Sequence, residues 1–278
     1  MGKFYTHLPP HLVSWILSQP IFFVSTAPLS AKGHINVSPK GTFPNINSFG
    51  YISTSQSQSQ SSDKRKPVAQ FWYLDLSGSG SETISHLYEP SNARITIMFC
   101  EFAPDSAPRI VRLFGHGRVL ECGTDNFKKW TKKEGVEVIP GARSVVVVEV
   151  ELVGDSCGFA VPVMEFRERR EVLCELWRKK VKVKGERVEG GKGEETMERY
   201  WAYKNAWSLD GLPGMEVARR IGEKEGIKPI EKMVGPMAND LPCARRKRYG
   251  ESSIWTVILQ VLLTAIVVLV GERLLGFA

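Results

Sequence analysis

The stretch INVSPKG, Ile35–Gly41, decides the fold. It follows the apolar run Pro20–Ala27 after a short connection that contains Gly33, and two short runs joined in this way predict a strand, a turn and a second strand. The second strand carries Ser38 and Lys40 near its end. A hydroxyl and an ammonium group side by side can bind a phosphate beside a sheet edge, although the same residue types also end ordinary polar hairpins.

Short strand-like segments dominate the first 160 residues, and helix candidates are few. This pattern predicts an antiparallel barrel rather than a parallel, doubly wound sheet, so we expect a mainly β fold with peripheral helices. The further expected strands are 68–76, 94–102, 110–120 and 144–153, and the expected helices are 9–17, a helix that starts at 82, and 126–134.

A second group of small and hydroxyl residues, Ser77–Ser81, precedes the helix that is expected to start at Glu82. The free N–H groups and the dipole of a helix N-terminus favour a phosphate, and Ser81 and Thr83 would add hydroxyl donors. The carboxylate of Glu82 would compete with an anion unless it is turned outward. A phosphate site and a plain capped helix therefore both fit this segment.

Composition and motifs exclude several classes of protein. The net charge is +7, but much of the positive charge lies in 167–184 and 245–248 rather than along a stripe, so we expect no nucleic-acid partner. Five widely spaced cysteines without a C-x-x-C pair argue against a disulfide framework and a zinc site, and favour a reducing, cytosol-facing location. The sequence has no nucleophile elbow, P-loop or dinucleotide fingerprint, and its five histidines lack metal-binding spacing, so we assign no catalytic residue and no metal.

The rest of the chain is expected to divide into three parts after a barrel domain at 1–160. The barrel carries a Ser/Gln-rich insert at 53–66, which is expected to be disordered. An uncharged run, 254–270, reaches roughly 26 Å as a helix and predicts a membrane span with the N-terminal domain in the cytosol, because the Arg/Lys cluster precedes it. The expected parts are a helical extension at 161–215, a linker with the basic cluster at 216–251, and a single-pass transmembrane tail anchor at 252–271.

Several segments taken together resemble the pyridoxamine 5'-phosphate oxidase-like flavin-binding proteins. They are Ile35–Gly41, Tyr73–His86 (YLDLSGSGSETISH), Ile95–Phe102 (ITIMFCEF) and Ile110–Val119 (IVRLFGHGRV), while Ser156–Glu165 and Trp201–Met215 are similar to a less-studied branch of the same family. The resemblance implies a six-stranded antiparallel split β-barrel, a homodimer, and FMN in a groove between the subunits. Carried over by position, it implies that the flavin phosphate lies near Ser38, Lys40, Ser81 and Thr83, and that Asn36 and Val37 face the isoalloxazine ring.

One departure limits what the resemblance implies. Pyridoxamine phosphate oxidases hold their substrate with an Arg/His pair near the C-terminal end, and this sequence has no histidine after His116. We therefore expect a membrane-tethered, FMN-binding flavoprotein that acts as an FMN-dependent oxidoreductase on a small molecule, rather than an enzyme of vitamin B6 synthesis. The alternatives are a flavin- or haem-binding carrier or sensor without turnover, and a tethered interaction protein whose barrel has lost its ligand.

Overall fold

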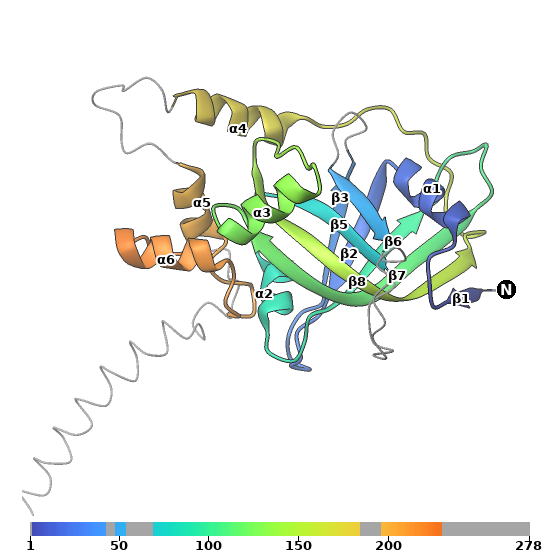
Figure 1. Cartoon of the computed structure of the whole chain (residues 1–278), viewed down its shortest axis with the longest axis horizontal. Coiled ribbons are helices and arrows are strands. Elements are labelled where there is room, and N and C mark those ends of the chain that lie inside the picture. The colour runs from blue at the N-terminus through green and yellow to red at the C-terminus, as the bar shows by residue number, and fades with distance from the viewer. Residues whose placement is uncertain (1, 43–47, 54–68, 184–195, 230–278) are drawn as a thin grey trace, which may run out of the picture.

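A single antiparallel sheet forms the body of the molecule (Figure 1). The computed structural model describes residues 2–42, 48–53, 69–183 and 196–229, and within them the strand order is β3-β2-β6-β7-β8-β5-β4, with β1 paired to β8. The strands are β1 (Lys3–Tyr5), β2 (Ile21–Thr26), β3 (Asn36–Gly41), β4 (Phe49–Ser53), β5 (Ala69–Leu76), β6 (Arg94–Cys100), β7 (Arg109–Glu121) and β8 (Ala142–Cys157). The helices are α1 (Pro10–Ser18), α2 (Glu82–Tyr88), α3 (Asp125–Lys133), α4 (Val172–Val183), α5 (Met197–Lys204) and α6 (Glu216–Glu225).

The sheet is rolled around an aromatic core. Phe22 on β2 lies against Phe71 on β5, with ring centroids 5.6 Å apart. These strands are four places apart in the sheet order, so a flat sheet would separate them by roughly 19 Å, at about 4.8 Å per strand. The long strand β7 bends at Gly115, where a Cβ atom would lie 1.9 Å from the carbonyl oxygen of Glu149, so glycine permits this bulge. The result is the open, curved sheet of a split barrel.

Strand β5 and the first part of β8, at 142–148, are buried on both faces. Val146 and Val148 point into the barrel core, whereas Val145 and Val147 pack on the other face in a cluster that includes Phe127 of α3. A strand covered on both sides has no polar face, which explains why the sequence shows an unbroken valine run instead of alternation.

The C-terminal helices pack closely on the barrel. Trp201 of α5 and Val217 of α6 belong to one buried cluster with Ile84 of α2. The first residues of α6 are held by the buried carboxylate of Glu121, at the end of β7. Its two oxygens accept the backbone N–H groups of Glu216 and Val217 at 2.7 and 2.8 Å. The sequence predicted a loosely structured linker from 216 onward, whereas the structure forms α6 there.

The predicted fold class is corrected in two respects. The described residues form eight strands rather than six, because the short strands β1 and β4 add to the sheet. The fold class also included a C-terminal transmembrane helix at 252–271, and the predicted localisation was a membrane with a single-pass anchor. In the part of the chain that the structure describes, no helix is long and apolar enough to cross a membrane. The longest described helix, α4, has 12 residues and so spans about 18 Å, well short of the ~30 Å hydrocarbon core.

The fold class is therefore corrected to a mainly β split barrel with peripheral helices. The predicted membrane anchor has no support in the residues that the structure describes. The predicted segment 252–271 itself lies outside the described residues, as do the basic cluster at 245–248 and the predicted insert, apart from Ser53.

Replacement of Glu121 with Gln is expected to lower the free energy of unfolding by about 2–3 kcal/mol, because the amide has only one acceptor oxygen, so that one of the two charge-assisted hydrogen bonds to α6 becomes a weaker neutral one and the other is lost. Urea unfolding monitored by circular dichroism measures this loss. The matched control is Glu137→Gln at an exposed loop position. Equal unfolding midpoints for the Glu121 and Glu137 variants would contradict this account of α6.

Candidate functional site

Strand β3 presents two different faces. Asn36, Ser38 and Lys40 are half-buried and point to one side, because successive side chains of a strand alternate. Val37 points to the other side and is 60% exposed. The structure therefore separates Val37 from the other predicted residues of this strand.

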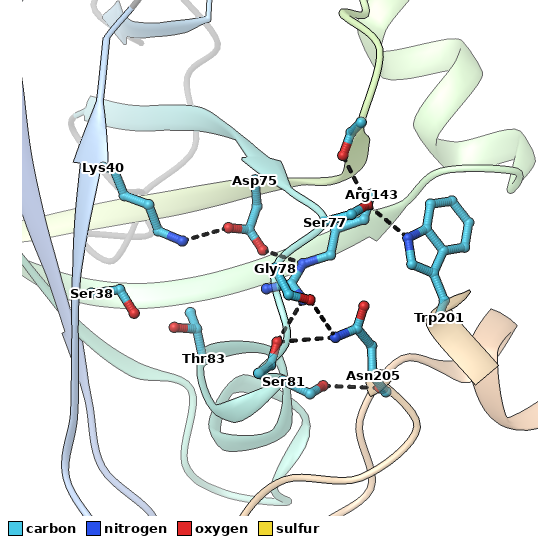
Figure 2. A network of polar contacts seen from close by, with 12 residues as sticks. Ser38, Lys40, Asp75, Ser77, Gly78, Ser81, Thr83, Arg143, Trp201 and Asn205 are labelled. Carbon is cyan, nitrogen blue, oxygen red and sulfur yellow. Dashed lines mark hydrogen bonds and ion pairs between the residues drawn. The ribbon is translucent and has the colours of Figure 1, made fainter. Parts of the chain in front are cut away.

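Three of the predicted site residues meet between β3 and α2. The Asn36 amide nitrogen, Nδ2, donates to Ser38 Oγ at 3.1 Å and to Thr83 Oγ1 at 3.0 Å. Figure 2 shows the hydroxyls of Ser38 and Thr83 turned toward one another across this space. Lys40 lies farther along the same face, and so adds a positive charge to a group of hydrogen-bond donors.

A buried carboxylate fixes the position of Lys40. Asp75, at the bulge near the end of β5, is fully buried and accepts from Lys40 Nζ at 2.7 Å and from Arg143 Nε at 2.8 Å. Burial by itself would raise the pKa of Asp75, but the charges of Arg143 and Lys40 outweigh it and lower the pKa from 3.8 to about 2. The three side chains carry one net positive charge (Figure 2).

A cavity of about 260 Å³ opens beside Lys40. Tyr73, Gly78 and Ser48 line it together with apolar residues that include Phe22 and Leu173. Its volume lies just below the lower end of the usual range for small-molecule sites, about 300–1,000 Å³, so it can hold only part of a cofactor-sized ligand.

Ser81 has a different role from the one the sequence predicted. It is fully buried, and its hydroxyl donates to the carbonyl oxygen of Asn205 at 3.0 Å. Asn205 Nδ2 in turn donates to the carbonyls of Gly78 and Gly80, at 3.0 and 3.2 Å, while Trp201 Nε1 donates to Ser77 Oγ at 2.8 Å (Figure 2). The turn before α2 is therefore held by the segment that follows α5, and the structure does not bring Ser81 to the group at β3.

Glu82 binds the C-terminal segment. Its Oε1 accepts the backbone N–H of Leu209 at 3.2 Å, so the carboxylate faces the C-terminal segment. One carboxylate oxygen of Glu82 is therefore occupied by the protein itself.

The sequence analysis missed Asp75, Arg143 and the pair formed by His34 and Asp210. The Asp210 carboxylate accepts the backbone N–H of His34 at 2.7 Å and lies 2.6 Å from its Nδ1, which ties the start of β3 to the C-terminal segment. One signal was available: Asp75 is the single acid within the apolar strand at 69–76. Such a residue is buried and therefore needs cationic partners.

Comparison with known proteins shows a clear relative. No protein-family model matches the sequence. The pyridoxamine 5'-phosphate oxidase family protein ustO of Aspergillus flavus is 39% identical over 224 residues, which cover 79% of this chain and 80% of that protein.

The chain belongs to the pyridoxamine 5'-phosphate oxidase family.

The family membership confirms the resemblance that the sequence motifs indicated. Among solved structures, a variant of HupZ from Group A Streptococcus is 18% identical, with 54% of this chain and 100% of that chain covered and a TM-score of 0.34. A FAD-binding protein from Mesorhizobium loti is 11% identical, with 56% and 97% covered and a TM-score of 0.32. Likenesses this weak add no argument to the family membership.

Asp75 predicts a specific acid sensitivity. Because its folded-state pKa of about 2 lies below the ordinary 3.8, its ionised form contributes stability above pH 3.8 that is lost as the pH falls toward 2. The contribution is about 2 kcal/mol, at about 1.36 kcal/mol per pKa unit. We expect Asp75→Asn to lack this part of the pH dependence, and to be less stable at pH 7 by about 3–5 kcal/mol because two cations lose their partner.

Urea unfolding at a series of pH values measures both effects, and the exposed residue Asp105, replaced by Asn, serves as the control. An Asp75→Asn protein with the parent's pH dependence between 3.8 and 2 would show that this carboxylate is not stabilised by its neighbours.

Proposed function

We propose that this protein binds FMN at the group formed by β3 and α2 and acts as an FMN-dependent oxidoreductase on a small molecule. The observation that carries the proposal is the half-buried ammonium of Lys40, which is 21% exposed and lies on the same strand face as the cluster of Asn36, Ser38 and Thr83. Family membership and the sequence motifs support the same cofactor.

The residues present fit the phosphate of a flavin. A phosphate dianion is bound by cations and by N–H and O–H donors. Lys40 supplies the charge, and Ser38 and Thr83 supply hydroxyls. Asp75 would repel an anion by itself, but Arg143, 2.8 Å away, compensates its charge. We therefore assign Ser38, Lys40 and Thr83 to the phosphate and Asn36 to the adjoining part of the cofactor.

Two predicted residues take other roles in this proposal. Ser81 shapes the turn before α2 through its bond to Asn205 and does not contact the cofactor. Val37 lies on the opposite face of β3, and we propose that it contacts a second subunit.

The division of labour follows from these contacts. FMN supplies the hydride chemistry when it is bound, and this chain binds and orients it. Asp75 holds the Lys40 ammonium in place, and Arg143 Nη1 donates to the carbonyl of Gly80 at 2.6 Å and so steadies the turn before α2. The site is thus organised before a ligand arrives, which lowers the entropic cost of binding.

Replacement of Lys40 with Gln is expected to weaken FMN binding by about 10- to 100-fold, because a charge-assisted contact to the phosphate is lost. Titration of the purified protein with FMN, followed by quenching of flavin fluorescence, gives the dissociation constant. Lys32→Gln, at an exposed position in the preceding turn, is the matched charge control. Unchanged affinity in a folded Lys40→Gln protein would remove Lys40 from the site.

The absorbance spectrum of the protein as purified separates the functional alternatives. Flavin bands support the proposal, whereas a Soret band would indicate haem and contradict it. Reduction of bound FMN by NADPH or NADH then distinguishes an oxidoreductase from a carrier.

The outer face of β3 supports a homodimer. Within the described residues β3 pairs only with β2, and its outer side carries Val37 next to Ile35, which is 72% exposed. Exposed apolar side chains on an edge strand favour association with another chain.

Val37→Lys is expected to shift the protein from dimer to monomer, because a charge would have to be buried at the interface. Sedimentation velocity measures the mass, and Thr96→Lys on β6 is a control for added charge on another strand. A Val37→Lys protein that remains dimeric would place the interface elsewhere.

A further inference from the structure

A second cavity, widely open to solvent, lies between β7 and α3, and four of the residues that line it are exposed: Arg118, Asn126, Lys129 and Lys133. Its volume is about 310 Å³. The lining residues are Arg118 and Leu120 of β7 and Asn126, Lys129, Trp130 and Lys133 of α3. None of these belongs to the group at β3, so the two sites are separate.

Three cations line this cavity and no carboxylate does. Lys133 is paired with Glu134 at 2.9 Å and lies in the last turn of α3, where a cation complements the helix dipole. An ion pair and the helix dipole thus explain the position of Lys133. Neither explains Lys129, which lies in the middle of the helix, or Arg118, which lies on a strand. In the described part of the chain, the side chains of Arg118 and Lys129 form no ion pair. Uncompensated like charges around one cavity favour an anion.

The cavity also contains a fixed aromatic ring. Trp130 is half-buried and packs edge-to-face on the buried Trp72, with ring centroids 5.3 Å apart and an interplanar angle of 74°. This contact holds the indole in place while it still lines the cavity. A held indole offers a surface on which a planar ring stacks at little entropic cost.

We propose that this cavity binds a nucleoside monophosphate or a planar anion of similar size. Arg118 and Lys129 would hold the phosphate, and the base would stack on Trp130. Base–aromatic stacking and cationic contacts to phosphate are the two interactions that this lining provides. The volume lies near the lower end of the range for small-molecule sites, about 300–1,000 Å³, which leaves room for one nucleotide.

Isothermal titration calorimetry with AMP tests the proposal on the full-length protein. We expect saturable binding at one site, and binding at least about tenfold weaker for adenosine, which lacks the anion, and for ribose 5-phosphate, which lacks the ring. Arg118→Gln and Lys129→Gln are each expected to weaken AMP binding by about tenfold or more.

Lys128→Gln and Lys132→Gln are matched controls, because they remove the same charge from exposed positions on the same helix that do not line the cavity. We expect them to change the affinity by less than about twofold. Lys40→Gln is expected to leave it unchanged, so the result does not depend on flavin binding.

Three results would each overturn the proposal: no saturable AMP binding, equal weakening by Lys132→Gln and Arg118→Gln, or equal affinity for ribose 5-phosphate and AMP. The second would indicate a general effect of surface charge, and the third a site for phosphate alone.

Discussion

The ion pairs of Asp75 with Lys40 and Arg143 are the interaction on which the rest of the site depends. They join the edge strand β3, the central strand β8 and the end of β5 at one fully buried carboxylate. An isolated charge at this depth would cost several kcal/mol, so the carboxylate is stable only with both cations in place. The same requirement places the Lys40 ammonium on the polar face of β3, beside Ser38 and Thr83. The fold thus positions Lys40 in the proposed binding group through Asp75, a charge that the ligand itself need not touch.

The C-terminal segment extends this network across the chain. Arg143 and Asn205 both donate to the carbonyl of Gly80, so the turn before α2 is held from β8 and from the end of α5. The chain approaches so closely here that a Cβ atom on Gly214 would lie 2.2 Å from the Asn205 carbonyl oxygen. Asp210 binds His34 at the start of β3. The segment between α5 and α6 therefore contacts both elements of the proposed flavin site, and is more than an appended extension.

The sequence predicted the features that depend on local pattern and missed those that depend on distant contacts. Alternation and apolar runs located β2, β3, β5, β6, β7 and β8, and the family motifs indicated residues that do meet, namely Asn36, Ser38 and Thr83. Helix α6 was missed because its sequence, EVARRIGEKE, is mostly polar, and a buried residue 95 positions away, Glu121, holds its first turn. The contact of Ser81 could not be predicted for a similar reason: a serine before a helix is a normal phosphate ligand or cap, and nothing local shows that its hydroxyl donates to the carbonyl oxygen of Asn205, 124 residues later. The prediction of a membrane span rested on the length of the uncharged run at 254–270 and on the basic cluster before it, and no described helix supports it.

Hydrogen–deuterium exchange of the full-length protein, with and without FMN, tests the central claim most directly, because it locates the cofactor without a mutation. The account predicts slower exchange on FMN binding in β3, at 36–41, and at the start of α2, around Thr83, with little change in α3. Protection confined to other elements would show that FMN binds elsewhere. The absence of any protection at saturating FMN would contradict flavin binding at this site.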